Sequence, residues 1–287
     1  VRAIVAEPGC VRAIETPRDA AALDDMARAF STLLTRNGRY FQARWIDESG
    51  QERVRVERTR GQAVRRSDDL QDKSRRYYFR DALTQPPGTL MFSRLDLNVE
   101  HEVVQEPHLP TVRLVLRVAR SDGTPSGILV INLDMRDLLE EIRQARLNAG
   151  SEVELLNSRG EWLSGSDTGD DFAFMFGRDA TLARRDPALW AQISAEEHGR
   201  RIDAAVWSWL RFDPIVDTKP AAARQNQSPW IFLAVVDESE VAAIRAGVVP
   251  QAVLWGFGVI GLFGLLSWRL ARDQHRLSSA LDEAKLT

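Results

Sequence analysis

Residues 40–58 read YFQARWIDESGQERVRVER, and this stretch decides the fold that we predict for the chain. Phe41–Ile46 and Arg53–Val56 are rich in aromatic and β-branched residues, and they flank the turn-forming sequence Asp47-Glu48-Ser49-Gly50. Two such runs separated by a short acidic turn that contains glycine are typical of a β-hairpin. We therefore predict that an antiparallel sheet begins here.

Further helices and strands surround the hairpin in the predicted first domain. Apolar residues at helical spacing predict a helix over 19–35, which ends at Asn37 and Gly38. The following patterns predict a helix over 70–83, strands over 89–97, 111–119 and 127–133, and an amphipathic helix over 136–147. Five antiparallel strands with a helix between the second and the third predict an α+β domain with one covered sheet face.

A second, shorter set of elements repeats this pattern. Strands are predicted over 153–156, 161–163, 201–212 and 230–236, with a helix over 187–195. Trp207 and Trp209 alternate with Ser208, so we expect one face of their strand to fill the second core. The predicted organisation is an N-terminal helical region (1–38) followed by two tandem antiparallel-sheet domains (39–148 and 149–247).

The segment Ala252–Trp268 consists of apolar residues and glycine, with Ser267 as the one exception. Extended to 248–270, it is long enough to span a membrane as a helix, although a buried core helix is the alternative. Because basic residues follow it, the positive-inside rule places residues 271–287 in the cytoplasm. Residues 1–247 are then expected on the outer side of the cytoplasmic membrane.

Residues beyond the predicted span begin a further helix. Leu270, Leu277 and Ala284 recur every seven residues, which fits a short parallel coiled coil or a plain helical stub. An exported domain also needs an export signal or an earlier spanning helix. We therefore expect the sequence to be part of a longer protein.

Composition excludes several classes of function. The 287 residues carry a net charge of −3, which gives no overall attraction to nucleic acid. The single cysteine, Cys10, excludes an intramolecular disulfide and any multi-cysteine metal site. Valines alternate with the first arginines of the basic run Arg53–Arg66, so we interpret this run as the solvent face of a strand. No metal, cofactor or nucleic-acid partner is predicted.

Two short motifs resemble functional sites of other proteins. Gly256-x-Gly258-x-x-Gly261 matches a dinucleotide fingerprint, but it lies inside the predicted span, where close helix packing is the simpler role. Asp167-Thr168-Gly169 resembles an aspartic-protease triplet, but that chemistry needs two carboxylates that share a proton, and the triplet occurs once. The sequence predicts no catalytic site in this chain.

Three blocks of the first domain resemble the double Cache (dCache, PAS-like) sensor domains of bacterial receptors. They are Tyr40–Arg53, Leu70–Phe79, and Ser93–Glu100 with Pro107 and Pro110–Arg113. The resemblance covers about residues 18–247 and implies two PAS-like domains on a long N-terminal helix, with a ligand bound in the membrane-distal one. Such domains are the extracytoplasmic sensors of histidine kinases, diguanylate cyclases and chemoreceptors.

The resemblance also implies candidate ligand-binding residues. Amino-acid-binding members carry an Arg-x-Trp-Tyr motif, which aligns with Arg75, Tyr77 and Tyr78, and a later aspartate, which aligns with Asn132. Because Asn132 cannot neutralise an ammonium group, a small organic acid or another anion is the expected ligand. Arg75 would then grip a carboxylate bidentately, with Tyr78 and Ser93 as hydrogen-bond partners.

Two questions stay open at this point. Arg75 has a structural interpretation, in which it holds its own loop through Asp72 or Asp96. The predicted function is that of a homodimeric sensor in a bacterial inner membrane, which passes a signal to a missing cytoplasmic output domain. A histidine kinase is the preferred output, a diguanylate cyclase or chemoreceptor the alternative, and a membrane-anchored hydrolase that uses the Asp167 loop or an adhesion module the other classes.

Overall fold

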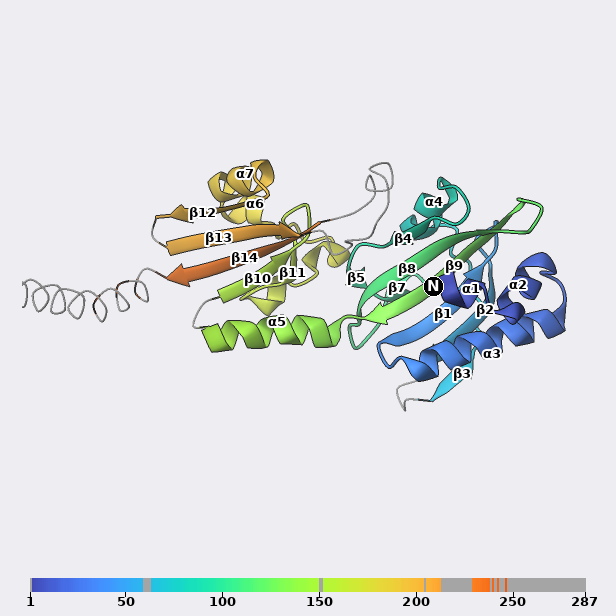
Figure 1. Cartoon of the computed structure of the whole chain (residues 1–287). Coiled ribbons are helices and arrows are strands. Elements are labelled where there is room, and N and C mark those ends of the chain that lie inside the picture. Colours follow the sequence, from blue (N-terminus) through green and yellow to red (C-terminus); the bar gives the residue numbers. More distant parts are fainter. Residues whose placement is uncertain are drawn as a thin grey trace, which may run out of the picture. The chain divides into compact units, whose positions relative to one another are not determined.

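A computed structural model describes residues 2–58, 63–149, 152–203, 205–212 and 229–237, together with positions 239, 242 and 246. Two antiparallel sheets with associated helices account for most of these residues (Figure 1). Among them, no helix is both long and apolar enough to cross a membrane. The predicted span 248–270 and the predicted cytoplasmic segment 271–287 lie outside the described residues.

Seven strands form the first sheet within the described residues, in the order β3-β2-β1-β9-β8-β4, with β5 paired to β8. Their bounds are β1 (Tyr40–Ile46), β2 (Glu52–Arg58), β3 (Val64–Arg66), β4 (Leu90–Phe92), β5 (Asp96–Leu97), β8 (Pro110–Ala119) and β9 (Pro125–Asp134). A separate hairpin joins β6 (Val99–Glu100) and β7 (Val103–Val104).

The predicted hairpin is confirmed as β1 and β2. Trp45 pairs with Val54, and the register shifts between Trp45 and Ile46. The Asp47 carboxylate accepts hydrogen bonds from the backbone N–H of Ser49 (2.9 Å) and of Gln51 (3.2 Å), which fixes the turn.

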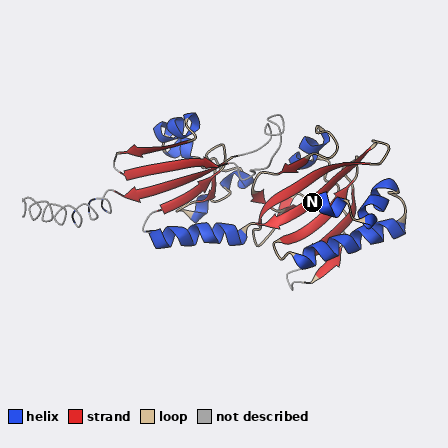
Figure 2. Ribbon diagram, in the orientation of Figure 1, coloured by secondary structure: helices blue, strands red, loops and turns tan. Residues whose placement is uncertain are grey.

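One face of the first sheet packs on α2 (Pro8–Glu15) and α3 (Ala20–Arg36), as Figure 2 shows. Asp19 caps α3, because its side chain accepts a hydrogen bond from the N–H of Ala21 (2.9 Å). The buried stripe of α3 meets the alternating apolar side chains of the sheet. Members of this core are Met26, Phe30, Leu34, Ala43, Trp45, Val54, Val56, Leu114, Leu116, Leu129 and Ile131.

The opposite face of the first sheet is covered by α4 (Tyr77–Leu83). Tyr78, Phe79 and Ala82 of this helix pack against a small apolar cluster that includes Val115 and Val130. Because successive side chains of a strand point to opposite faces, the residues between the apolar ones of the first core also lie on this face. Many of them are charged, and the candidate site is built from them.

A second sheet has the strand order β11-β10-β14-β13-β12. Its strands are β10 (Glu152–Leu156), β11 (Trp162–Ser164), β12 (His198–Ile202), β13 (Ala205–Phe212) and β14 (Trp230–Asp237). Its helices are α5 (Arg136–Ala149), α6 (Leu182–Arg185), α7 (Pro187–Ala195) and the short 3-10 helices η1 (Thr168–Asp170) and η2 (Ala173–Phe176). Leu139 and Ile142 of α5 share a core with Leu155, Leu163 and Trp230.

The predicted α+β class with tandem antiparallel sheets is confirmed, whereas one predicted helix is too long. Residues 70–76 are not helical, and α4 begins only at Tyr77. Their backbone groups bond to the hairpin instead: the N–H of Lys73 donates to the carbonyl of Gly50 (2.7 Å), and that of Glu52 to the carbonyl of Gln71 (3.0 Å). These tertiary hydrogen bonds override the local helical pattern.

Two predicted strands are each divided in the structure. The stretch 89–97 becomes β4 and β5, because the Ser93 hydroxyl, in place of a backbone carbonyl, accepts the N–H of Arg113 (2.9 Å). The stretch 201–212 is divided between β12, which ends at Ile202, and β13, which begins at Ala205, and the N–H of Asp203 donates to the carbonyl of Ala205 (3.1 Å). Trp209 is buried as predicted. The predicted domain limits remain predictions.

Sequence patterns missed several short elements. The helices α1 (Arg2–Val5) and α2 precede the predicted first helix, and the strands β3, β6 and β7 are only two or three residues long. Elements of this length carry too few residues to show a clear period, and contacts with neighbouring elements hold them: α1 and α2 contact α3, β3 pairs with β2, and β6 pairs with β7.

Candidate functional site

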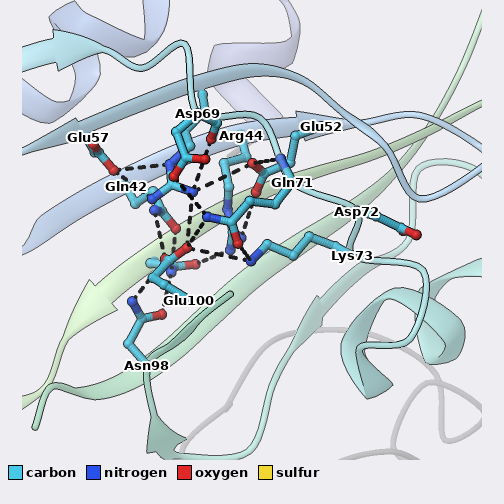
Figure 3. A network of polar contacts seen from close by, with 12 residues as sticks. Gln42, Arg44, Glu52, Glu57, Asp69, Gln71, Asp72, Lys73, Asn98 and Glu100 are labelled. Carbon is cyan, nitrogen blue, oxygen red and sulfur yellow. Dashed lines mark hydrogen bonds and ion pairs between the residues drawn. The ribbon is translucent and has the colours of Figure 1, made fainter. Parts of the chain in front are cut away.

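Charged and amide side chains fill the α4-covered face of the first sheet, where an apolar core would be usual. We call them the polar face, and Figure 3 draws part of the set. Its members are the partly exposed Glu100 and the buried residues Gln42, Arg44, Glu52, Arg55, Gln71, Lys73, Asp96, Asn98, Arg113 and Asn132. Burial of charged groups is costly unless each finds partners. The hydrogen bonds of the polar face show how this requirement is met.

Arg44 on β1 is the centre of the polar face. Its Nη1 donates to Glu52 Oε1 (3.1 Å) and to the hydroxyl of Tyr78 (3.3 Å), and its Nη2 donates to Asn132 Oδ1 (2.9 Å). The side chains of Arg44 and Glu52 are 2% and 0% exposed. One guanidinium group therefore ties together β1, β2, β9 and α4.

Glu100 on β6 collects a second set of donors. Its carboxylate accepts from Arg55 Nη1 (3.0 Å), Gln71 Nε2 (3.0 Å), Asn98 Nδ2 (3.1 Å) and Gln42 Nε2 (3.2 Å). Burial alone would raise the pKa of Glu100, but the nearby charges of Arg44, Arg55 and Lys73 outweigh burial and lower it to about 2. Glu100 is therefore ionised in the folded protein.

Lys73 completes this network from the segment before α4. Its Nζ donates to Gln71 Oε1 (2.6 Å) and lies 3.5 Å from Glu100 Oε2. Burial, assisted by the positive charge of Arg44, lowers the pKa of Lys73. The three cations Arg44, Arg55 and Lys73 are balanced by the carboxylates of Glu52, Glu57 and Glu100. The network is thus neutral within itself.

A second buried ion pair lies next to α4. Arg113 Nη1 donates to Asp96 Oδ1 (2.6 Å), and the Tyr77 hydroxyl donates to Asp96 Oδ2 (3.0 Å). Burial lowers the pKa of Arg113, but the charge of Asp96 outweighs burial and raises it. The ring of Tyr78 lies 5.1 Å from the Arg113 guanidinium carbon. Arg113 and Asp96 are therefore a fixed, mutually neutralised pair.

The predicted site residues fall into three places. Tyr78 and Asn132 meet at Arg44, and Tyr77 and Ser93 meet at the Arg113–Asp96 pair. Arg75 lies apart from both, exposed in the turn before α4. Asp72 is held by Ser74, whose backbone N–H donates to Asp72 Oδ1 (2.8 Å). Those bonds to Ser74 lower the pKa of Asp72, and the charge of Arg75 adds to the effect.

Sequence reasoning missed the residues that organise this face. Arg44, Glu52 and Arg113 were given no role, and Asp96 was considered only as a partner of Arg75, although Gln42 and Arg44 alternate with the core residues Ala43 and Trp45. This alternation was the available signal, because it places charged side chains on one face of a central strand.

The solvent-face interpretation of the run Arg53–Arg66 is wrong for Arg55. This side chain is buried, and its guanidinium bonds to Glu57 (2.8 Å) and Glu100 (3.0 Å). The face opposite Val54 and Val56 is covered by protein rather than by water, so its arginine needs internal partners.

A solvent-open pocket lies beside the half-buried Tyr77. Arg75, Arg76, Arg80 and Arg94 line it. Within the described residues, none of these four arginines forms a salt bridge, and the Arg94 guanidinium stacks over the Tyr77 ring at 4.0 Å. Asp96 also lines the pocket, but its charge is used by Arg113, while Glu102 adds one exposed carboxylate. Arg159 and Glu161 line it as well and are paired with each other. The first domain therefore presents an excess of positive charge here.

Among the described residues, no group of three or more histidine, cysteine, aspartate or glutamate side chains is arranged to hold a metal ion. The loop that the hydrolase alternative would use is exposed, and its Asp167 caps η1 by accepting the N–H of Gly169 (2.9 Å). This hydrogen bond gives Asp167 a structural role.

Replacement of Arg44 and of Arg75 by alanine should distinguish a buried structural arginine from an exposed one by the loss of stability. Arg44→Ala leaves Glu52 buried without its cation, so the free energy of unfolding should fall by about 3–5 kcal/mol. Arg75→Ala should change it by less than about 0.5 kcal/mol, because Arg75 is exposed. Urea unfolding measures both. Equal losses in the two variants would contradict this description of the polar face.

The lowered pKa of Glu100 predicts that the folded protein loses stability in acid. Its folded pKa of about 2 lies below the ordinary 4.5, so its stabilisation is complete above the ordinary value and is lost as pH falls towards the folded value. The shift corresponds to about 3 kcal/mol. Glu100→Gln should therefore destabilise the protein at about pH 7 and flatten the pH dependence of unfolding between about pH 5 and pH 2. Glu102→Gln, on the same hairpin, is the control; a steep acid transition that survives in Glu100→Gln would assign it to other carboxylates.

Comparison with known proteins identifies the family. Residues 13–207 match the family model described as bacterial histidine kinase, sensor domain. No curated protein sequence matches the chain.

Solved structures with a similar fold are bacterial sensor domains. The extracellular domain of the histidine kinase named vpHK1S-Z8 superposes with a TM-score of 0.66 at 18% identity, covering 84% of this chain and 83% of that one. A sensory box/GGDEF family protein of Vibrio parahaemolyticus gives 0.66 at 18% identity, covering 83% and 87%. The periplasmic sensory domain of the Campylobacter jejuni chemoreceptor Tlp1 gives 0.58 at 11% identity, covering 83% and 86%. These likenesses concern the fold, and the family match, which spans more than half of the sequence, shows that this chain belongs to the bacterial histidine kinase sensor domains.

Proposed function

We propose that this chain is the extracytoplasmic sensing region of a membrane-bound bacterial receptor, and that its first domain binds a small anionic ligand beside Tyr77. The observation that supports this most strongly is the group of arginines at that pocket, which form no salt bridge within the described residues. Unpaired guanidinium groups around one concave surface are suited to carboxylate or phosphate groups.

Arg75 is the primary ligand-binding residue in this proposal. Its side chain is exposed and free to form a bidentate contact, and Arg76 and Arg80 add charge at the same pocket. Tyr77 forms part of the wall, and Arg94 is pre-oriented by stacking on its ring. A ligand with two or more acidic groups would use more than one of these arginines.

The other candidate residues act behind the pocket. Ser93 accepts the N–H of Arg113, and Tyr78 and Asn132 bond to Arg44. They hold α4 and its preceding turn in place, and so position Arg75. Among the described residues that line the pocket, no buried carboxylate is left to neutralise an ammonium group on the ligand, because Asp96 is bonded to Arg113 and Tyr77 and Glu161 is bonded to Asn157 and Arg159. The ligand is therefore an acid without an amine requirement.

The receptor architecture rests on the sequence and the family. A span over 248–270, a homodimer and a cytoplasmic histidine kinase output fit the family and the basic residues that follow the span. A diguanylate cyclase or a chemoreceptor output is the alternative, because sensor domains with this fold occur in proteins of those classes.

Ligand binding is tested with the full 287-residue chain in detergent and with succinate, citrate and inorganic phosphate as probes. A bound anion should stabilise the wild-type chain by RT ln(1 + [L]/Kd), about 2.7 kcal/mol at 100 Kd, in a thermal-shift assay. Arg75→Ala should remove this stabilisation while the melting temperature without ligand stays unchanged. The matched control is Arg36→Ala, an exposed arginine of α3 that does not line the pocket.

Two outcomes would contradict the ligand proposal. If all three probes leave the wild-type melting temperature unchanged, the arginine pocket is not an anion site. If Arg75→Ala unfolds the domain, Arg75 is a structural residue.

The membrane topology is tested by labelling single cysteines with a membrane-impermeant maleimide. Native Cys10 is fully buried, and burial raises the pKa of its thiol to about 12, so it should give little background. A thiol introduced as Gly169→Cys, on the exposed loop around η1, should react in intact cells with a permeable outer membrane. A thiol introduced as Ser279→Cys should react only after lysis. The opposite pattern would rule out an extracytoplasmic sensor.

A further inference from the structure

A second pocket, of about 580 Å³, lies within the first domain. We propose that it binds a small hydroxylated monocarboxylate of the sugar-acid type. This pocket is separate from the arginine pocket beside Tyr77, and the inference goes beyond the proposed function. Gln42, Gln105 and Arg65 would contact the ligand, against a wall that includes Phe41.

Three amide groups line the pocket and are held in fixed orientations. Gln42 and Asn98 are each 2% exposed. Gln42 Oε1 accepts from Asn132 Nδ2 (3.0 Å) while its Nε2 donates to Glu100, and Asn98 Nδ2 donates to Gln105 Oε1 (2.8 Å). Among the described residues, these bonds leave one N–H of Gln42 and both N–H groups of Gln105 without an acceptor. Pre-oriented amides of this kind suit the hydroxyl groups of a polar ligand.

The charges that line the pocket leave one positive charge in excess. Four arginines and three carboxylates line it, namely Arg55, Arg58, Arg65 and Arg136 with Glu57, Glu100 and Asp134. Glu57 and Glu100 are paired with Arg55, and Asp134 is paired with Arg136. The Arg58 guanidinium donates to the carbonyl of Leu34. Within the described residues, Arg65 is exposed and forms no salt bridge, so a ligand with a single carboxylate matches this surface.

An irregularity in β1 brings an aromatic ring to the same pocket as an amide. The pairing of β1 with β9 shifts register between Tyr40 and Gln42, and the consecutive residues Phe41 and Gln42 both line the pocket. A bulge re-aims one side chain in this way. Phe41, with Pro107 and Leu109, supplies apolar surface for the carbon skeleton of the ligand.

The test uses the full chain in detergent, isothermal titration calorimetry, and D-gluconate, D-glucuronate and quinate as probes. At least one should bind, and D-glucitol, which lacks the carboxylate, should bind at least tenfold more weakly. Arg65→Gln should weaken the affinity for the acid by about tenfold and leave the affinity for D-glucitol unchanged. Arg36→Gln removes an exposed charge that does not line the pocket, so it should change neither affinity.

A blocking variant tests the location independently of charge. Gly38 lines the pocket, and a Cβ placed on it would meet no atom within 4 Å, so Gly38→Trp should fold and fill the space. It should abolish binding of the acid, whereas Thr35→Trp, on the exposed end of α3, should not. Melting temperatures of both variants report on folding.

Three results would overturn the proposal. The first is that none of the three acids binds to the wild-type chain. The second is that Gly38→Trp folds and binds the acid as tightly as the wild type. The third is that Arg75→Ala abolishes binding of the acid while Arg65→Gln does not, which would place the ligand in the arginine pocket beside Tyr77.

Discussion

The contact between Arg44 and Glu52 constrains the rest of the first domain. Both side chains are almost completely buried between the central strands and α4. Removing two charges from water costs several kcal/mol each, which their mutual attraction offsets only when the remaining donors and acceptors are also bonded. Tyr78 and Asn132 accept hydrogen bonds from Arg44, whose Nε alone has no partner among the described residues, and the N–H of Gln71 donates to Glu52. The positions around the pair must therefore be occupied by polar side chains or backbone groups that can bond to it.

This constraint explains which parts of the fold the sequence could predict. The hairpin, the long strands and α3 follow from period-2 and period-3.6 patterns, because their apolar faces meet a core without regard to exact partners. Residues 70–76 follow a different rule. Gln71 and Lys73 are placed by bonds to Gly50, Glu52 and Glu100, which are distant in sequence, so a local pattern predicts a helix there and is wrong.

The candidate site was predictable to a similar degree. The tyrosines Tyr77 and Tyr78 were found because they belong to a motif, but their hydrogen bonds to Asp96 and Arg44 were not predicted. Alternation assigns a side chain to a face of a strand and carries no information on which charge of another strand it will meet. The division of arginines into buried, paired ones (Arg44, Arg55, Arg113) and exposed ones without a salt bridge likewise needs the fold.

The two pockets share a short length of chain. Asp96 and Glu102 line the arginine pocket, whereas Asn98 and Glu100 line the second pocket, so residues 96–102 contact both. At the tip of this segment His101 and Glu102 both have positive φ (49° and 62°), a conformation that costs a non-glycine residue about 1–2 kcal/mol. The N–H of His101 donates to Gln71 Oε1 (3.1 Å), and Gln71 also bonds to Glu100, so the polar face stabilises the turn. A ligand that alters the contacts of Glu100 therefore alters the balance that keeps this turn in place. A ligand can bias a protein only if its affinity differs between two arrangements of the protein. If both pockets were occupied, the β6–β7 hairpin is the element of the first domain through which one ligand would affect the affinity for the other. Linkage requires that this effect be reciprocal.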